Sequence, residues 1–217
     1  MSQNVELIAA INIGNSRSEY ANPFIRKIFV NDNQCNIRET ELCIEADFLD
    51  RNIAETYKMM LQLVAYTIVI NPNSKKIFVA QRTGGEQRLE NQYCIGFGGH
   101  VEIQDYNIQD NEIPNPILKC AKRELREELR IKNKYLEFNH LGFARDLSSP
   151  TSEHLGSIYY VTTGSASLKE KDKFSCAKWV SYEEFKEKYY FKLETWSKAI
   201  FDYIYETDYY RKLFNFG

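Results

Sequence analysis

Apolar positions alternate in strand-like runs from residue 63 onward. Residues 64–70 are rich in β-branched side chains, and residues 76–81 repeat this character after a turn at residues 71–74. Proline fixes φ and asparagine tolerates tight turns, so the two runs predict a β-hairpin. A short third strand is expected over residues 93–97, where it meets Gly98.

Helical spacing appears later in the chain. Residues 117–129 form the strongest predicted helix and follow Pro116, a residue tolerated in a first helical turn. Ser181 is expected to cap a second helix, and apolar residues recur at helical spacing over residues 193–204. Further strands are expected at residues 135–145, 157–163 and 177–180. This order predicts a mixed α+β domain.

The first 60 residues are the least regular. Residues 24–30 could form a strand, and the rest mixes apolar and acidic positions without a clear period. The sequence therefore predicts an extension, or extra strands, over residues 1–60 and a main domain over residues 61–217.

Charge and composition narrow the function. The chain has 28 basic and 30 acidic residues, a net charge of −2, so a broad surface for a nucleic acid polymer is not expected. No apolar run reaches the roughly 20 residues of a membrane helix, and no signal peptide is recognisable. The five cysteines contain no C-x-x-C pair, which favours reduced thiols and a cytoplasmic location.

The predicted helix at residues 117–129 carries an unusual acidic face. Glu124, Glu127 and Glu128 fall within an arc of about 100°, where like charges repel each other. A solvated helix with Arg–Glu pairs is the plain interpretation. The upstream Gly98 and Gly99 favour another one, because a double glycine lets backbone approach a ligand closely. Mg²⁺ or Mn²⁺ would relieve the repulsion and bring substrate phosphates to the site.

These residues resemble a known family. Gly99, followed by Arg123-Glu124-Leu125-x-Glu127-Glu128-x-x-Ile131, is similar to the Nudix box of the Nudix hydrolase superfamily. The resemblance covers about residues 60–207. It is nearest to the MutT-like predicted phosphoesterases in three stretches: Arg82-Thr-Gly-Gly-Glu-Gln-Arg88-Leu, Ile95-Gly-Phe-Gly-Gly-His100 and Leu193-Glu-Thr-Trp-Ser.

The resemblance implies an α/β/α sandwich with a mixed β-sheet between helices. It also implies that Glu127 and Glu128 are metal ligands and that Glu124 is a ligand or helps to hold the reactive water. Arg123 would orient a carboxylate, and the Gly98 carbonyl would complete the metal site. Candidates for the general base are Glu153 and Asp146.

Two departures from the box stand out. Gly99 and Arg123 enclose 23 residues where the box has thirteen, so about ten are inserted. Counting back from Arg123 places Asn115 where the box has glutamate. The missing carboxylate is either absent or supplied by the insertion at residues 105–114, where Asp105, Asp110 and Glu112 are available. The second departure is Arg130 in place of a helix-ending glycine, so the helix could run further or end differently.

Three residues are candidates for substrate binding. Arg82 and Arg88 flank a glycine turn and could bind phosphate, or they could simply keep the surface soluble. His100 could contact a phosphate or support the metal, although a lone histidine is more often structural.

The function expected from this resemblance is hydrolysis of a nucleoside diphosphate linked to another group. One alternative is an enzyme like isopentenyl diphosphate isomerase, for which Cys94 would be the catalytic cysteine. The other is a non-catalytic nucleotide-binding module, against which the complete carboxylate set argues. The expected partner is a small nucleoside diphosphate derivative, with neither a nucleic acid polymer nor a membrane. A homodimer is left open.

Overall fold

The fold is seen in a computed structural model. It describes residues 5–13, 29–31, 38–57, 59–84, 89–107, 115–133, 135–146, 153–206 and 214. The chain divides into two compact units. Unit 1 comprises residues 1–66, 98–123 and 140–158, and unit 2 comprises residues 67–97, 124–139 and 159–217. The expected α+β class is confirmed, with a large mixed sheet and few helices.

Unit 1 contains the described part of the first 60 residues. Strand β1 (Leu7–Asn12) pairs antiparallel with β3 (Asp47–Asp50) and with the start of β4 (Met60–Asn71), where Ile11 lies opposite Leu61. The short helices are α1 (Glu39–Glu45), α2 (Arg51–Ala54) and the 3-10 turn η4 (Ile103–Tyr106). The described N-terminal residues thus add strands to a sheet, while a domain boundary at residue 60 stays a prediction.

The other strands of unit 1 lie on either side of β4. Strand β7 (Gly96–His100) pairs with β4. On the other side follow β10 (Glu153–Thr162), β9 (Asn139–Asp146) and β2 (Phe29–Asn31), in that order. Of the strand expected at residues 24–30, only residues 29 and 30 lie within the described residues.

Unit 2 is built around the predicted hairpin. Strand β5 (Lys76–Arg82) pairs with the end of β4, with β6 (Tyr93–Cys94) and with β12 (Phe174–Ser181). Its core joins sheet residues such as Val69, Phe97 and Phe174 to Leu125. The strand expected at residues 93–97 is therefore two strands, β6 and β7, separated at Ile95.

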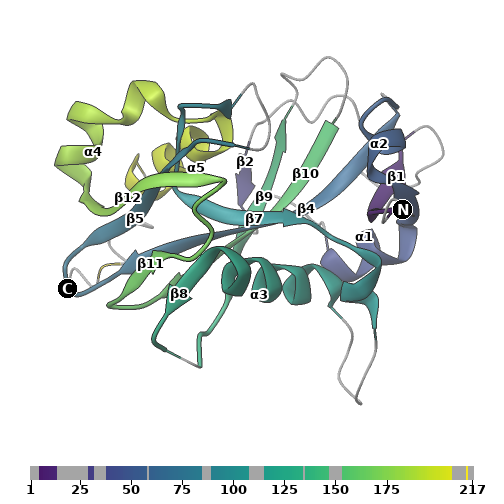
Figure 1. The fold of residues 1–217 in the computed structure, drawn as a ribbon, viewed down its shortest axis with the longest axis horizontal. Coiled ribbons are helices and arrows are strands. Elements are labelled where there is room, and N and C mark those ends of the chain that lie inside the picture. Colours follow the sequence, from purple (N-terminus) through teal and green to yellow (C-terminus); the bar gives the residue numbers. More distant parts are fainter. Residues whose placement is uncertain are drawn as a thin grey trace. The chain divides into compact units, whose positions relative to one another are not determined.

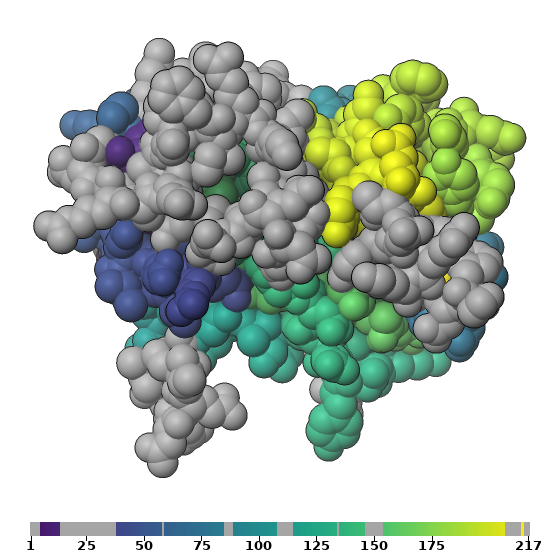
Figure 2. Space-filling model, turned by 180° about the vertical axis from the view of Figure 1, so that it is seen from behind, coloured from purple at the N-terminus to yellow at the C-terminus, as the bar shows by residue number. Residues whose placement is uncertain are grey.

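The C-terminal helices of unit 2 match the apolar pattern. Helix α4 (Tyr182–Lys188) begins after Ser181, whose hydroxyl accepts a hydrogen bond from the Glu184 amide at 3.4 Å. Helix α5 (Thr195–Glu206) follows a 3-10 turn, η5 (Tyr190–Lys192). The rings of Phe185 and Phe201 stack at 4.4 Å, and the two helices form one continuous mass in Figure 2. None of the helices that the structure describes is long and apolar enough to cross a membrane.

The end of α3 (Pro116–Glu128) explains how the chain does without a glycine there. The helix stops at Glu128, and the next residues form β8 (Leu129–Ile131), which pairs with β11 (Ala166–Leu168) (Figure 1). Backbone amides of Lys169 and Glu170 donate to the Glu128 carbonyl at 2.8 and 3.2 Å. Because this carbonyl is satisfied by another segment, no left-handed residue is needed and Arg130 lies in an ordinary strand.

Candidate active site

Helix α3 carries the acidic residues, and two of them are buried. Glu124 is 6% exposed and Glu128 only 1%, whereas Glu127 is exposed. Leu125 and Leu129 are buried in the same part of the helix, at 2% and 3%. Two of the three glutamates on the acidic face are therefore removed from water, and the third is exposed.

Glu128 is poorly compensated. Its Oε1 atom lies 3.8 Å from the Lys173 ammonium, and its buried Oε2 atom has no hydrogen-bond partner among the described residues. Burial, and then the neighbouring Glu124 carboxylate, raise the pKa of Glu128 to about 8, although Lys173 and Arg82 act against this. A buried carboxylate with an unpaired oxygen and a like charge nearby is an arrangement that a cation would stabilise.

The donor set fits a hard divalent cation. Within the described ranges, no three His, Cys, Asp or Glu side chains gather closely enough to form a complete protein cage. Mg²⁺ does not require such a cage, because it commonly uses one or two carboxylates together with water and substrate phosphates. The unpartnered oxygen of Glu128 and the adjacent Glu124 offer that kind of partial site.

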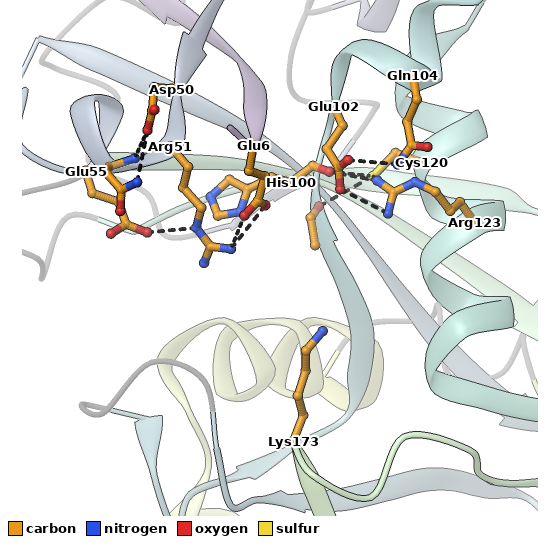
Figure 3. A network of polar contacts seen from close by, with 12 residues as sticks. Glu6, Asp50, Arg51, Glu55, His100, Glu102, Gln104, Cys120, Arg123 and Lys173 are labelled. Atoms are coloured by element: carbon orange, nitrogen blue, oxygen red, sulfur yellow. Dashed lines mark hydrogen bonds and ion pairs between the residues drawn. The ribbon is translucent and has the colours of Figure 1, made fainter. Parts of the chain in front are cut away.

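Arg123, the residue before Glu124, belongs to a different cluster in unit 1. Its Nε and Nη2 atoms donate to Oδ1 and Oδ2 of Asp105 at 3.0 and 2.9 Å, a side-on fork. Nη1 lies 3.4 Å from Glu102 Oε1, and Nη2 also donates to the His100 carbonyl at 3.0 Å. Figure 3 shows Arg123, Glu102 and Cys120 converging here. Asp105 is 4% exposed and also accepts from the Glu102 amide at 2.9 Å.

This cluster shows where the inserted residues fall. Asp105 is the sixth residue after Gly99, the spacing at which the box has its first glutamate. Counting forward from Gly99 would have found it, whereas counting back from Arg123 led to Asn115. Asn115 instead accepts from the Leu118 amide at 3.0 Å and so caps α3. Asp110 and Glu112 lie outside the described residues.

Gly98 has a packing role of its own. A Cβ atom added at Gly98 would stand 1.9 Å from the Ala65 carbonyl oxygen, because β7 lies against β4 there. No other residue fits this approach without moving backbone. Gly98 belongs to unit 1 and the three glutamates to unit 2, so a metal role for its carbonyl stays a prediction.

Of the candidate substrate-binding residues, Arg82 is held in an ion pair. Its Nε atom donates to Glu194 Oε2 at 2.6 Å, and its guanidinium lies over the Phe174 ring at 5.5 Å. Glu194 also accepts from Ser197 Oγ at 3.0 Å, and that hydroxyl accepts from the Ile95 amide at 3.0 Å. The three stretches that resemble the MutT-like phosphoesterases thus meet in one buried network.

The other candidates are placed differently. Arg88 lies outside the described residues. The His100 ring is buried in unit 1, its Nε2 atom has no hydrogen-bond partner there, and its pKa is lowered by burial, by His154 and by Arg51. Such a histidine stays neutral at pH 7, so it would act toward a phosphate only as a neutral donor.

Two further sequence candidates concern the chemistry itself. Cys94 is fully buried, donates to the Ala80 carbonyl at 3.6 Å, and burial raises its pKa. A thiol in this setting is a poor nucleophile. Asp146 and Glu153 end β9 and begin β10, but their side chains lie outside the described part of the structure.

Sequence reasoning did not single out Lys173 and Glu170. Both lie in the polar run Lys169-Glu-Lys-Asp-Lys173, which has no period and no motif. Only the return of this segment to the end of α3 brings them to Glu128.

Known proteins resemble this chain in sequence and in fold. A family model described as the NUDIX domain matches residues 60–202. Protein YmaB from Bacillus subtilis (strain 168) is 30% identical over 168 residues, which cover 73% of this chain and 79% of YmaB. The crystal structure of Tm1382, described as a Nudix hydrolase, matches with a TM-score of 0.69 at 24% identity, over 93% of this chain and 99% of Tm1382. A NUDIX hydrolase from Alicyclobacillus acidocaldarius matches with a TM-score of 0.52 at 12% identity, over 68% of this chain and 92% of that protein.

Proposed function

Because the chain belongs to the Nudix hydrolase family, whose members act on nucleoside diphosphate derivatives, we propose that it is a Mg²⁺- or Mn²⁺-dependent pyrophosphohydrolase. Its substrate would be a nucleoside diphosphate linked to another group. The observation that carries this proposal is Glu128, a buried carboxylate with one unpartnered oxygen beside Glu124.

In this proposal the residues of α3 have different roles in metal binding and in positioning. Glu124, Glu127 and Glu128 would hold the cation, which when bound would lower the pKa of a water and offset phosphate charge. Arg123 binds Asp105 and so fixes the turn of helix that precedes Glu124. Glu127 is exposed, so it would contact metal or substrate from the solvent-facing side of α3.

The candidate substrate-binding residues are proposed to support the site. Arg82 would act by holding Glu194 and adding positive charge near Glu128, rather than by leaving its ion pair to bind phosphate. Arg88 and His100 stay proposals for substrate binding. From the family assignment we also propose that the ligand is a small nucleotide derivative and that the protein is cytoplasmic. A homodimer stays open.

The two alternatives are less well supported. An isomerase like isopentenyl diphosphate isomerase would need a reactive cysteine, and the Cys94 thiol is buried with a raised pKa. A non-catalytic nucleotide-binding module would gain nothing from two buried glutamates next to each other, because their repulsion costs stability without metal.

The test is product release over a panel of nucleoside diphosphate derivatives, with Mg²⁺ and with excess chelator. We expect nucleoside monophosphate and a second phosphorylated product, and no turnover in chelator. Glu187→Gln is a matched control, because Glu187 is an exposed acid on α4. Turnover that survives chelator would overturn the metal dependence, and binding without any cleavage would favour the non-catalytic module.

A further inference from the structure

The segment between β11 and β12 is fastened to the metal-side end of α3. Lys169 and Glu170 donate their backbone amides to the Glu128 carbonyl, and Lys169 Nζ donates to the Arg126 carbonyl at 3.0 Å. Three hydrogen bonds therefore fix where this segment begins. Its last residue, Lys173, directly precedes β12, which is itself paired with β5. Both ends of the segment are thus held within unit 2.

Lys173 presents its ammonium to the carboxylates at this place. Nζ lies 3.2 Å from Glu170 Oε2 and 3.8 Å from Glu128 Oε1, and its side chain is extended (Figure 3). The side chain is 45% exposed, whereas the Glu128 side chain is 1% exposed. The lysine therefore reaches a buried carboxylate from the solvent side.

We propose that Lys173 is a substrate-binding residue that occupies the place of the cation until the metal binds. This inference rests on the proposed function. A divalent cation on Glu128 and an ammonium 3.8 Å from the same carboxylate repel each other, so metal binding weakens the hold on Lys173. The flexible four-carbon stem of lysine then lets the ammonium turn toward a phosphate of the substrate.

The charges support this exchange. The Lys173 ammonium lies near the Glu128 and Glu170 carboxylates and also feels the charge of Glu124, while Glu128 Oε2 has no hydrogen-bond partner among the described residues. Divalent metal supplies more positive charge to this group than Lys173 does. The Lys173 ammonium is then without a counter-ion, and the diphosphate of the substrate, which binds together with the metal, can replace it.

The simple alternative is a surface pair. Lys173 and Glu170 are three residues apart in sequence, and exposed pairs of this kind contribute little to stability. In that case removal of the lysine would affect neither metal nor phosphate binding beyond the loss of one surface charge.

The experiment measures two binding constants without requiring turnover. Mn²⁺ affinity is measured by electron paramagnetic resonance on metal-free protein, and inorganic pyrophosphate affinity by calorimetry on Mn²⁺-loaded protein. The variants are Lys173→Met and Lys169→Met. The second removes the same charge from the same segment, at a lysine bonded to a backbone carbonyl. Thermal unfolding confirms that each variant is folded.

We expect Lys173→Met to change the affinities for Mn²⁺ and for pyrophosphate in opposite directions. Mn²⁺ should bind about 3- to 10-fold more tightly, since a competing charge is gone, and pyrophosphate about 10-fold more weakly. In Lys169→Met both constants should stay within about 2-fold of the original, because its ammonium faces a carbonyl rather than the carboxylates. Changes of the same sign, or no difference from Lys169→Met, would overturn the inference.

Failure of the proposed function gives a different result. If the unaltered protein binds no Mn²⁺, the metal-dependent function is wrong and the role of Lys173 is wrong with it. If it binds Mn²⁺ and hydrolyses nucleotides but Lys173→Met behaves like Lys169→Met, only the role of Lys173 is wrong.

Discussion

Helix α3 contributes to two acidic clusters that differ in how their charges are matched. In the arginine cluster, formed by Glu102, Asp105 and Arg123, both oxygens of Asp105 accept hydrogen bonds from the guanidinium. In the glutamate cluster, formed by Glu124, Glu128, Glu170 and Lys173, one ammonium faces several carboxylates and Glu128 Oε2 has no partner. Asp105 and Glu128 are similarly buried, at 4% and 1%.

The two clusters differ in whether the buried carboxylate is fully hydrogen-bonded. Burial alone does not distinguish them, because both carboxylates are removed from water. What differs is the number of hydrogen-bond donors that each carboxylate receives: both oxygens of Asp105 accept from Arg123, whereas Glu128 Oε2 has no partner among the described residues. A satisfied buried carboxylate stabilises the fold, whereas an unsatisfied one lowers stability until a cation binds.

The largest effect is expected from Glu128→Gln, which removes a charge from the glutamate cluster at nearly constant volume. We expect turnover to fall at least ~10²-fold, the scale seen when an electrostatic catalytic group is removed. Metal-free stability near pH 8 should not fall. Steady-state kinetics at saturating Mg²⁺ test this, with Glu187→Gln as the control, and a variant with the original rate would remove Glu128 from the site.

The matching change in the arginine cluster is Asp105→Asn. It leaves the Arg123 guanidinium without its fork partner in a mostly buried position, so we expect a loss of roughly 3 kcal/mol in the free energy of unfolding. Mn²⁺ affinity of the folded protein should change little. Urea denaturation and metal titration together test the difference between the clusters. A stable Asp105→Asn variant that has lost Mn²⁺ binding would show that Asp105 belongs to the metal site.

The pH dependence of stability should reveal Glu128. Its pKa is about 8 in the folded protein, above the ordinary 4.5, so the folded state binds more protons between these values. Metal-free stability should therefore fall as pH rises from about 5 to 8, by on the order of 3 kcal/mol, and level off above that. Added Mg²⁺ should restore it at pH 8.

Denaturation at several pH values measures this slope, and Glu128→Gln is the reference. The variant has no titrating group at this position, so its metal-free stability should depend less on pH. An equal slope in both proteins would mean that Glu128 is already ionised at pH 5.

The smallest effect is expected in the insertion. If Asp105 is the acidic partner of Arg123, then Asp110 and Glu112 are not needed to replace it. The double variant Asp110→Asn, Glu112→Gln should keep its Mn²⁺ affinity within about 2-fold, because no carboxylate from the insertion beyond Asp105 is then required. A loss of affinity of tenfold or more in metal titration would show that the insertion supplies a ligand after all.

Local pattern determined much of this protein from sequence alone. The hairpin of β4 and β5, the helix at Pro116–Glu128 and the Ser181 cap all follow from side-chain periods and backbone preferences that act over a few residues. The spacing of Glu124, Glu127 and Glu128 likewise indicated the family, while the divalent cation that it predicts stays a prediction. These features depend on neighbours in sequence, so the sequence is enough to reveal them.

Only the tertiary structure decided which acids are satisfied. Asp105 and Arg123 are 18 residues apart in sequence, and Glu128 and Lys173 are further apart. The periodicity of neighbouring residues therefore predicts neither pair. The way α3 ends is decided in the same way, because its last carbonyl is capped by amides from Lys169 and Glu170 rather than by a glycine that follows it. Pairing and burial depend on segments brought together by folding, and they distinguish the fully hydrogen-bonded carboxylate of Asp105 from the poorly matched one of Glu128.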